Sequence, residues 1–305
     1  LSAYDIKDGK LLSTQSVLGG SYTVYASSKN IITASLSGGD GKLQVTRFSL
    51  NGGDITLEAA GELEGELLNQ FSIDEYKEHF RFVLTDNRGE YSSNSLVILD
   101  GNLKKTGAIS GIAEDERVYS VRFMGDTAYF VTFRQVDPLF SVDVSDPTSP
   151  KIIGSLKIPG FSNYLFPFGK GMLFGMGQNA DEKTGRSTGM KISMFDISDP
   201  SNVTECAKTD ISASYSEALY SHKATLINSG KNIIGFSAYG WQNNILYFIY
   251  AYENGELVKK AEINLPHSNT GCRGLYSGDK FYVVTPDVVY CFTLDGFKEL
   301  SVTEI

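Results

Sequence analysis

The sequence predicts an all-β protein that is built from repeats of about fifty residues. A strand-like stretch that ends in an aromatic residue recurs along the chain, followed by a small polar turn and a second apolar run. The aromatic residues are Tyr25, Tyr76, Phe123, Phe168, Tyr220 and Tyr276, at spacings of 51, 47, 45, 52 and 56 residues. A period of that length filled with short strands is typical of a β-propeller, in which each repeat forms one blade of four antiparallel strands.

The second half of each repeat is an apolar strand that runs into a tight turn and a more polar closing strand. Asp-Gly, Asn-Gly and Asp-Pro steps supply the backbone conformations that hairpin turns need. These hairpins turn at residues 4–9, 48–53, 98–101, 142–147, 195–200, 250–255 and 292–296. Because the same turn position recurs in many blades, a structural role is expected for Asp5, Asp8, Asp143, Asp146, Asp196 and Asp199.

Seven closing hairpins but only six aromatic openings predict six complete blades, preceded by the outer half of another. We expect a ring of seven blades, with part of a ring of eight or more as the alternative. The repeat runs through residues 1–305 without a Ser/Pro-rich linker, which indicates a single domain. The start inside a blade leads us to expect that an N-terminal portion of the parent protein lies upstream of Leu1.

The composition of the chain argues against two classes of binding partner, nucleic acid and the membrane interior. The net charge of −9 and a pI near 4.9 argue against nucleic acid, because phosphate binding requires stripes of Lys and Arg. No apolar run approaches the roughly 18 residues of a membrane span, so a membrane link is expected only through an N-terminal tether outside this chain.

The cysteines and histidines predict neither disulfides nor a metal site. Cys272 and Cys291 are expected on the first and third strands of one blade, about 9.5 Å apart, which is beyond disulfide reach. Cys206 belongs to another blade, so three free thiols are expected. The three histidines are scattered and no Cys-x-x-Cys pair exists, so we expect no metal and no cofactor.

Several segments resemble a group of secreted bacterial and archaeal proteins that carry a C-terminal β-propeller domain, distantly similar to WD40 proteins. These segments are residues 69–75, 117–126, 131–139, 158–165 and 215–223. The resemblance implies an extracytoplasmic protein, secreted or anchored at the cell surface, with more propeller upstream. It implies no chemistry. Where the group usually shows Tyr-Leu-His-Pro-Tyr, this chain has Phe166 in place of the histidine.

Charged residues near the innermost strands are the candidate site. Counting back from the aromatic ends places Glu75 and Arg122 at one level of neighbouring blades, and Glu217 and Arg273 at another. A charge against a blade interface is costly unless it is paired, so we predict the ion pairs Glu75–Arg122 and Glu217–Arg273.

These pairs have two possible roles. They lock blade to blade, or they line a polar central funnel that binds an anionic or sugar-like ligand. In the second case Arg134, Gln135 and Asp137, from a nearby turn, would complete a ligand-binding set with Glu75, Arg122, Glu217 and Arg273.

Two other groups of acidic residues give less support for a functional site. Asp74 and Glu75 are adjacent in a predicted strand, so their side chains lie on opposite faces and cannot form an acid–base pair. Asp40 lies between glycines, but it lacks the further acidic ligands of a calcium loop.

Two function classes follow. The favoured one is a non-catalytic extracytoplasmic binding module that recognises a protein, a peptide or a cell-wall polymer. The alternative is a propeller-type hydrolase or lyase that acts on an extracellular polymer at the channel mouth. No Gly-x-Ser-x-Gly motif is present, so no catalytic residue is predicted.

Overall fold

The computed structural model describes residues 1–17, 22–38, 41–133, 137–181, 186–213, 215–240, 245–265 and 271–305, without the side chain of Asp137. The chain forms two compact units. Unit 1 comprises residues 1–134 and 140–153, and unit 2 comprises residues 135–139 and 154–305.

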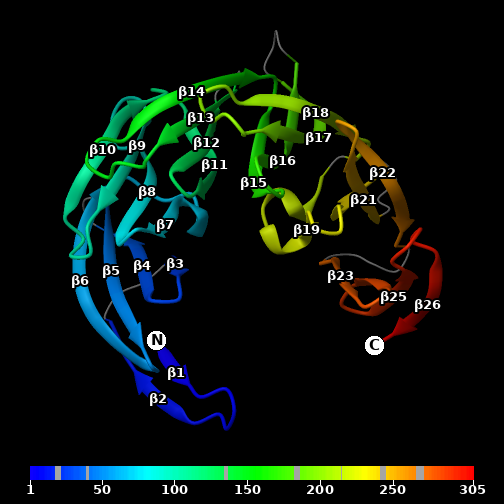
Figure 1. The fold of residues 1–305 in the computed structure, drawn as a ribbon, viewed down its shortest axis with the longest axis horizontal. Helices are drawn as coiled ribbons and strands as arrows, with labels where there is room; N and C mark the ends of the chain where they lie inside the picture. The colour runs from blue at the N-terminus through cyan, green and yellow to red at the C-terminus, as the bar shows by residue number, and fades with distance from the viewer. Residues whose placement is uncertain are drawn as a thin grey trace. The chain divides into compact units, whose positions relative to one another are not determined.

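The strands up to Ile158 form one two-stranded and three four-stranded sheets (Figure 1). Their bounds are β1 (Ser2–Tyr4) and β2 (Leu11–Thr14); β3 (Thr23–Ala26), β4 (Asn30–Leu36), β5 (Lys42–Asn51) and β6 (Asp54–Glu64); β7 (Ile73–Tyr76), β8 (His79–Asp86), β9 (Ser93–Leu99) and β10 (Lys105–Ile112); β11 (Arg117–Met124), β12 (Thr127–Phe133), β13 (Asp137–Asp143) and β14 (Lys151–Ile158). A short 3-10 helix, η1 (Gln70–Ser72), precedes β7.

The remaining strands form three more four-stranded sheets. They are β15 (Phe161–Pro167), β16 (Met172–Ala180), β17 (Ser187–Asp196) and β18 (Thr204–Ile211); β19 (Thr225–Asn228), β20 (Ile233–Tyr239), β21 (Ile245–Glu253) and β22 (Glu256–Asn264); β23 (Arg273–Ser277), β24 (Lys280–Val284), β25 (Val288–Thr293) and β26 (Glu299–Glu304). Two 3-10 helices, η2 (Glu217–Leu219) and η3 (His222–Ala224), precede β19.

Each four-stranded sheet is a simple meander. Its strands pair in chain order, and the registers of the pairs are antiparallel, as in β3-β4-β5-β6. In the described part of the chain there are thus six sheets of four strands and one of two, which confirms the predicted blades and half blade. The half blade lies against the outermost strand of its neighbour, where Ser13 Oγ donates to the carbonyl of Gly53, 2.7 Å away.

The core of each unit lies between the faces of consecutive sheets. In β8, alternate residues Phe80, Phe82 and Leu84 pack toward the sheet of β3–β6, while Val83 packs toward the sheet of β11–β14. A middle sheet is therefore buried on both faces, and its strands read as nearly continuous apolar runs. A polar side chain inside such a run lies at an interface between blades.

The recurring aspartates act as predicted. Asp143 and Asp196 accept hydrogen bonds from the backbone N–H two residues further on, each at 2.9 Å. Asp146 and Asp199 make the same 2.9 Å bond. The pKa of each of these four carboxyls is lowered by the hydrogen bonds that its turn donates. Their recurrence therefore reflects turn chemistry.

One repeat assignment is wrong. Tyr76 is the last residue of the first strand of its sheet, and Tyr25, Phe123 and Tyr276 are the second-to-last residues of theirs. Phe168 directly follows β15. Tyr220, however, caps η2 and lies outside any strand. The two 3-10 helices insert an extra segment before β19, so the first strand of that sheet lies five residues beyond Tyr220.

Cys206, Cys272 and Cys291 are not joined in disulfides; Cys272 is buried and Cys206 is exposed. Among the described residues, no helix has the length and apolar character needed to cross a membrane.

Candidate functional site

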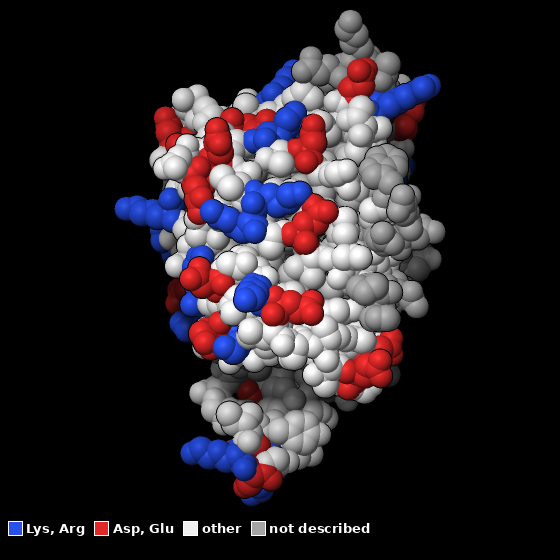
Figure 2. All heavy atoms as spheres, turned by 90° about the vertical axis from the view of Figure 1, so that its right-hand side faces the viewer, with Lys and Arg blue, Asp and Glu red and all other residues white. Residues whose placement is uncertain are grey.

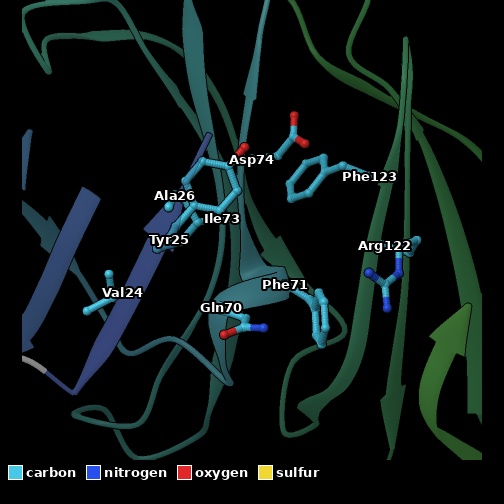
Figure 3. A pocket seen from close by; sticks show the side chains of 9 residues that line it. All are labelled: Val24, Tyr25, Ala26, Gln70, Phe71, Ile73, Asp74, Arg122 and Phe123. Carbon is cyan, nitrogen blue, oxygen red and sulfur yellow. The ribbon is translucent and has the colours of Figure 1, made fainter. Parts of the chain in front are cut away.

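A pocket of about 430 Å³ opens in unit 1, between the first strands of three consecutive sheets (Figure 3). Val24 and Tyr25 on β3 form one wall, and Arg122 and Phe123 on β11 form the other. The third contribution comes from η1 and β7, through Gln70, Phe71, Ile73 and Asp74. Apolar rings and a few polar groups thus converge on one cavity, which is the usual composition of a ligand site.

Arg122 is placed by the ring of Phe71. The Asn69 side chain caps η1 by accepting the N–H of Phe71 at 2.9 Å, so the helix holds this ring toward β11. The guanidinium carbon of Arg122 lies 4.0 Å from the ring centroid. A cation at that distance over an aromatic face is attracted by the ring quadrupole. The stacked pair presents a planar cationic group at the pocket wall (Figure 3).

Asp74 supplies the pocket's carboxylate, and Arg81 neutralises it. Arg81 Nε donates to Asp74 Oδ2 at 3.0 Å, and a second bond from Nη2 reaches the same oxygen. Arg81 also donates to the carbonyl of Gly125 at 2.6 Å. Its guanidinium carbon lies 4.7 Å from the Tyr76 ring and 4.9 Å from the Phe123 ring. The Arg81 side chain is only 2% exposed and belongs to the interior, whereas the Asp74 side chain is 25% exposed and lines the pocket.

Tyr25 closes the opposite wall. Its hydroxyl oxygen accepts the backbone N–H of Glu75 at 3.0 Å, which ties β3 to β7. Burial raises the pKa of the Tyr25 phenol, so the group stays protonated and neutral at ordinary pH.

Comparison with known proteins shows the same architecture. The family described as the Beta propeller domain matches residues 1–297. This chain belongs to that family. A protein of Archaeoglobus fulgidus is 34% identical over 261 residues, covering 85% of this chain and 38% of the relative. A protein of Methanocaldococcus jannaschii is 35% identical over 226 residues, covering 73% and 34%. The propeller domain thus spans well under half of the length of these relatives.

Solved structures share the fold at low sequence identity. A putative 6-phosphogluconolactonase from Bacteroides fragilis superposes with a TM-score of 0.60 at 13% identity, covering 100% of this chain and 88% of that one. The periplasmic gluconolactonase PpgL of Pseudomonas aeruginosa gives 0.59 at 11%, covering 100% and 91%. BamB from Moraxella catarrhalis gives 0.55 at 13%, covering 100% and 82%.

The predicted pair Glu75–Arg122 is wrong. Glu75 accepts hydrogen bonds from Asn30 Nδ2 at 2.7 Å and Ser27 Oγ at 2.5 Å, both in the preceding blade of the propeller. Arg122 also points to its preceding blade, where Phe71 lies. Glu75 and Arg122 occupy equivalent strand positions, so each side chain points toward the blade that precedes its own. The two side chains therefore do not face each other.

Glu75 lies instead in a second, polar cleft of about 870 Å³ beside the strand turns of unit 1. Asn30 links it to a half-buried cation, because Arg47 Nε donates to Asn30 Oδ1 at 2.8 Å. Arg47 also donates to the carbonyl of Gly101 at 2.5 Å. The Glu75 carboxylate is therefore engaged on both oxygens within the blade interface.

The predicted pair Glu217–Arg273 is confirmed. Arg273 Nη2 lies 2.7 Å from Glu217 Oε1, and Nη1 lies 3.0 Å from Oε2. Glu217 is on η2 and not on a strand, so it can face the arginine of the following blade. The hydrogen bond from Arg273 lowers the pKa of Glu217, and the same contact raises the pKa of Arg273.

The other residues that the sequence analysis considered add no further site. Arg134 and Gln135 lie outside the described residues, as do Asp40 and the side chain of Asp137. In the described ranges, no three His, Cys, Asp or Glu side chains gather as metal ligands would. Phe166, at the histidine position of the resemblance, packs on the core of unit 2 with its ring 6.2 Å from that of Phe174.

Sequence reasoning missed Phe71 and Arg81. Phe71 lies in the segment 69–75 that carries part of the resemblance, but a lone aromatic residue gives no hint that it supports an arginine of another blade. Arg81 did leave a signal, since it is the one charge within the apolar run 80–84. A cation in a strand buried on both faces requires a partner at the interface.

Proposed function

We propose that this propeller domain is a non-catalytic binding module, and that the pocket of Figure 3 takes a carboxylate carried by a peptide segment of a partner protein. The observation that carries this proposal is the guanidinium of Arg122, stacked on Phe71 in the pocket wall. A planar guanidinium fits a carboxylate in two parallel hydrogen bonds. Stacking on the ring holds the plane in place and reduces the side-chain freedom that binding would otherwise cost.

The electrostatics of the pocket support an anionic ligand. Asp74 would repel a carboxylate if it stood alone, but its charge is matched by Arg81. Arg122 brings a guanidinium group to the opposite wall. Val24, Phe71 and Phe123 supply apolar surface for the carbon atoms next to the acid group.

The strand edges beside the pocket favour a peptide. Among the described strands, β3 and β11 are terminal strands of their sheets and pair with β4 and β12. An unpaired strand edge offers backbone N–H and C=O groups to an extended chain, and side-chain pockets beside it give specificity. An acidic side chain of such a segment would reach Arg122.

A binding role is favoured over the alternative of a hydrolase or lyase. A catalytic carboxyl group must reach the substrate, whereas one oxygen of Asp74 already accepts two hydrogen bonds from Arg81. Tyr25 is held neutral by burial. The similar structures that are named as lactonases are 13% identical or less to this chain, so they support a shared fold and not a shared activity.

The proposal includes a location outside the cytoplasm, secreted or held at the cell surface, and a protein partner there. Binding of nucleic acid is not part of it. The net charge is −9, and the face in Figure 2 carries acidic and basic side chains interspersed, without a basic stripe.

The test compares two labelled hexapeptides that differ only in a central Asp-Asp or Asn-Asn pair. Fluorescence anisotropy should show tighter binding of the Asp-Asp peptide, and Arg122→Gln should weaken it about tenfold, the effect of roughly 1.4 kcal/mol. Arg117→Gln is the matched control, because Arg117 is an exposed arginine on the same strand. Equal affinity for the two peptides would overturn the ligand assignment.

Two further measurements test the other parts of the proposal. Hydrolysis of a gluconolactone by the wild-type protein that is lost in Asp74→Asn would contradict a non-catalytic role. Protease treatment of intact cells should degrade the protein if it lies outside the cytoplasm, and protection equal to that of a cytoplasmic marker would refute that location.

A further inference from the structure

A second surface, in unit 2, carries exposed aromatic rings that the proposed function does not use. Tyr220 is 65% exposed and Tyr215 is 44% exposed. Their ring centroids lie 5.8 Å apart with an interplanar angle of 22°, so the two rings stack. Tyr239 continues the cluster, 5.6 Å from Tyr215. We call Tyr215, Tyr220 and Tyr239 the tyrosine platform.

The platform is held rigidly from beneath. Ala218 and Leu219, between its first two tyrosines, are buried in the core of unit 2. Ser216 is buried and donates to the carbonyl of Ser237 at 2.5 Å. The backbone N–H of Tyr239 donates to the carbonyl of Tyr215 at 2.8 Å, and Tyr164 Oη donates to the carbonyl of Tyr220 at 2.9 Å. Rings placed this way lose little freedom when a ligand covers them.

The ion pair Glu217–Arg273 adjoins the platform. Glu217 lies between Tyr215 and Tyr220 in the chain, and its charge contributes to the raised pKa of Tyr239, of which burial is the main cause. Both members of the pair remain accessible, with side chains 33% and 37% exposed. Since the two charges cancel, the surface favours a neutral ligand over an ion.

The pair keeps hydrogen-bonding capacity. Arg273 has five N–H donors, and its bonds to Glu217 and to the carbonyl of Cys272 use three of them. Each Glu217 oxygen accepts one bond from Arg273 and has a second lone pair. The remaining donors and acceptors lie beside one another, as the two hydroxyls of a vicinal diol require.

We infer that the tyrosine platform with Glu217 and Arg273 is a binding site for a neutral saccharide chain of β-linked pyranose units. The C–H bonds on the face of a sugar with equatorial hydroxyls carry partial positive charge, which the negative face of a tyrosine ring attracts. The hydroxyls at the rim of the sugar then meet the carboxylate and the guanidinium. Tyr220, the most exposed ring of the platform, is the stacking residue.

The test uses cellohexaose as the probe and isothermal titration calorimetry as the measurement. The full chain should bind cellohexaose with an affinity that changes little between low and high salt. Tyr220→Ala should weaken binding about tenfold, since an aromatic contact contributes up to about 1.5 kcal/mol. Tyr220→Phe should retain most of the affinity, because the ring remains.

The matched control is Tyr91→Ala, which removes a 60% exposed tyrosine from unit 1 and should leave cellohexaose binding unchanged. The melting temperature of Tyr220→Ala should stay close to that of the wild type, since the ring is mostly in water. No binding of cellohexaose by the wild type would overturn the inference. Equal binding by Tyr220→Ala, or binding of a proline-rich peptide at this surface in place of the saccharide, would do the same.

Discussion

The ion pairs Asp74–Arg81 and Glu217–Arg273 both join an arginine to a carboxylate near the first strand of a sheet, yet they differ in their surroundings. Arg81 is 2% exposed and lies against two aromatic rings. Arg273 is 37% exposed, and its pair adjoins the tyrosine platform. The two pairs therefore differ in their arginines, which are buried in unit 1 and accessible in unit 2, while the carboxylates of Asp74 and Glu217 are 25% and 33% exposed. Burial decides whether such a pair stabilises the blades or remains accessible to a ligand.

The largest effect is expected for Arg81→Met. Methionine fills much of the space, but the Asp74 carboxylate and the Gly125 carbonyl lose their donor inside the blade interface. Removing one partner of a buried pair typically costs about 3–5 kcal/mol in the free energy of unfolding. Urea denaturation measures it. Arg88→Met is the control, because Arg88 makes ion pairs with Glu64 and Asp86 at the surface.

The double variant Arg81→Met with Asp74→Asn sharpens this result. With both charges removed, part of the lost stability should return, because no uncompensated charge remains at the interface. If Arg81→Met alone were as stable as the wild type, water would have to reach the Asp74–Arg81 pair, and the contrast between the two pairs would disappear.

A smaller loss is expected for Lys191→Met, in unit 2. Lys191 is 1% exposed, donates to the carbonyl of Pro159 at 2.6 Å and lies 3.9 Å from Glu205 Oε1. Its removal leaves the carbonyl of the half-buried Pro159 without that donor, at a cost of about 1–3 kcal/mol. Thermal unfolding of this variant separates burial from location, since Lys191 shares a unit with Arg273. A loss as small as that of Arg273→Gln would contradict the role of burial.

Arg273→Gln should cost only about 0.2–1 kcal/mol, the usual contribution of an accessible ion pair. Added salt should reduce the difference from the wild type, because exposed charges are screened. The same variant should lose affinity for cellohexaose. A loss of stability as large as that of Arg81→Met would place the Glu217–Arg273 pair in the interior.

The smallest effect is a pH dependence. Arg273 lowers the pKa of Glu217 below its ordinary value of 4.5, so the folded state binds that proton less readily than the unfolded state. The stability that the pair contributes is therefore complete above pH 4.5 and is lost as the pH falls through the lowered pKa. Glu217→Gln should match the wild type more closely at pH 3 than at pH 7 (roughly 0–1 kcal/mol apart at pH 7). An equal gap at both values would show that Glu217 does not titrate through this contact.

Local rules of the chain predicted most of the fold. The aromatic residues Tyr25, Tyr76, Phe123 and Tyr276 mark first strands because they lie where an apolar strand meets a turn. The Asp-Pro and Asp-Gly steps predicted the closing turns for the same local reason. Tyr220 does not mark a first strand, because η2 and η3 lie before β19. This insertion displaces the strand along the chain but leaves the spacing between the aromatic residues close to the repeat length.

The candidate site was predicted only in part. The sequence identified Arg122 and the pair Glu217–Arg273 as polar residues near first strands. It assigned Arg122 the wrong partner, because strand alternation states which residues share a face and not toward which neighbour that face points. In the folded protein Glu75 meets Asn30 of the preceding blade, and Arg122 meets Phe71 of its own preceding blade.

The amino-acid sequence by itself determined the blades, their strand order and the chemistry of their turns, since these depend on residues close together in the chain. Only the tertiary structure decided that Arg81 is buried between two aromatic rings, that Phe71 supports Arg122, and that Tyr215 and Tyr220 stack in the open. Those facts depend on the packing of one sheet face against the next, which joins residues about fifty positions apart, as Phe71 and Arg122 are. Periodicity in the sequence specifies the sheets, and packing between them specifies the sites.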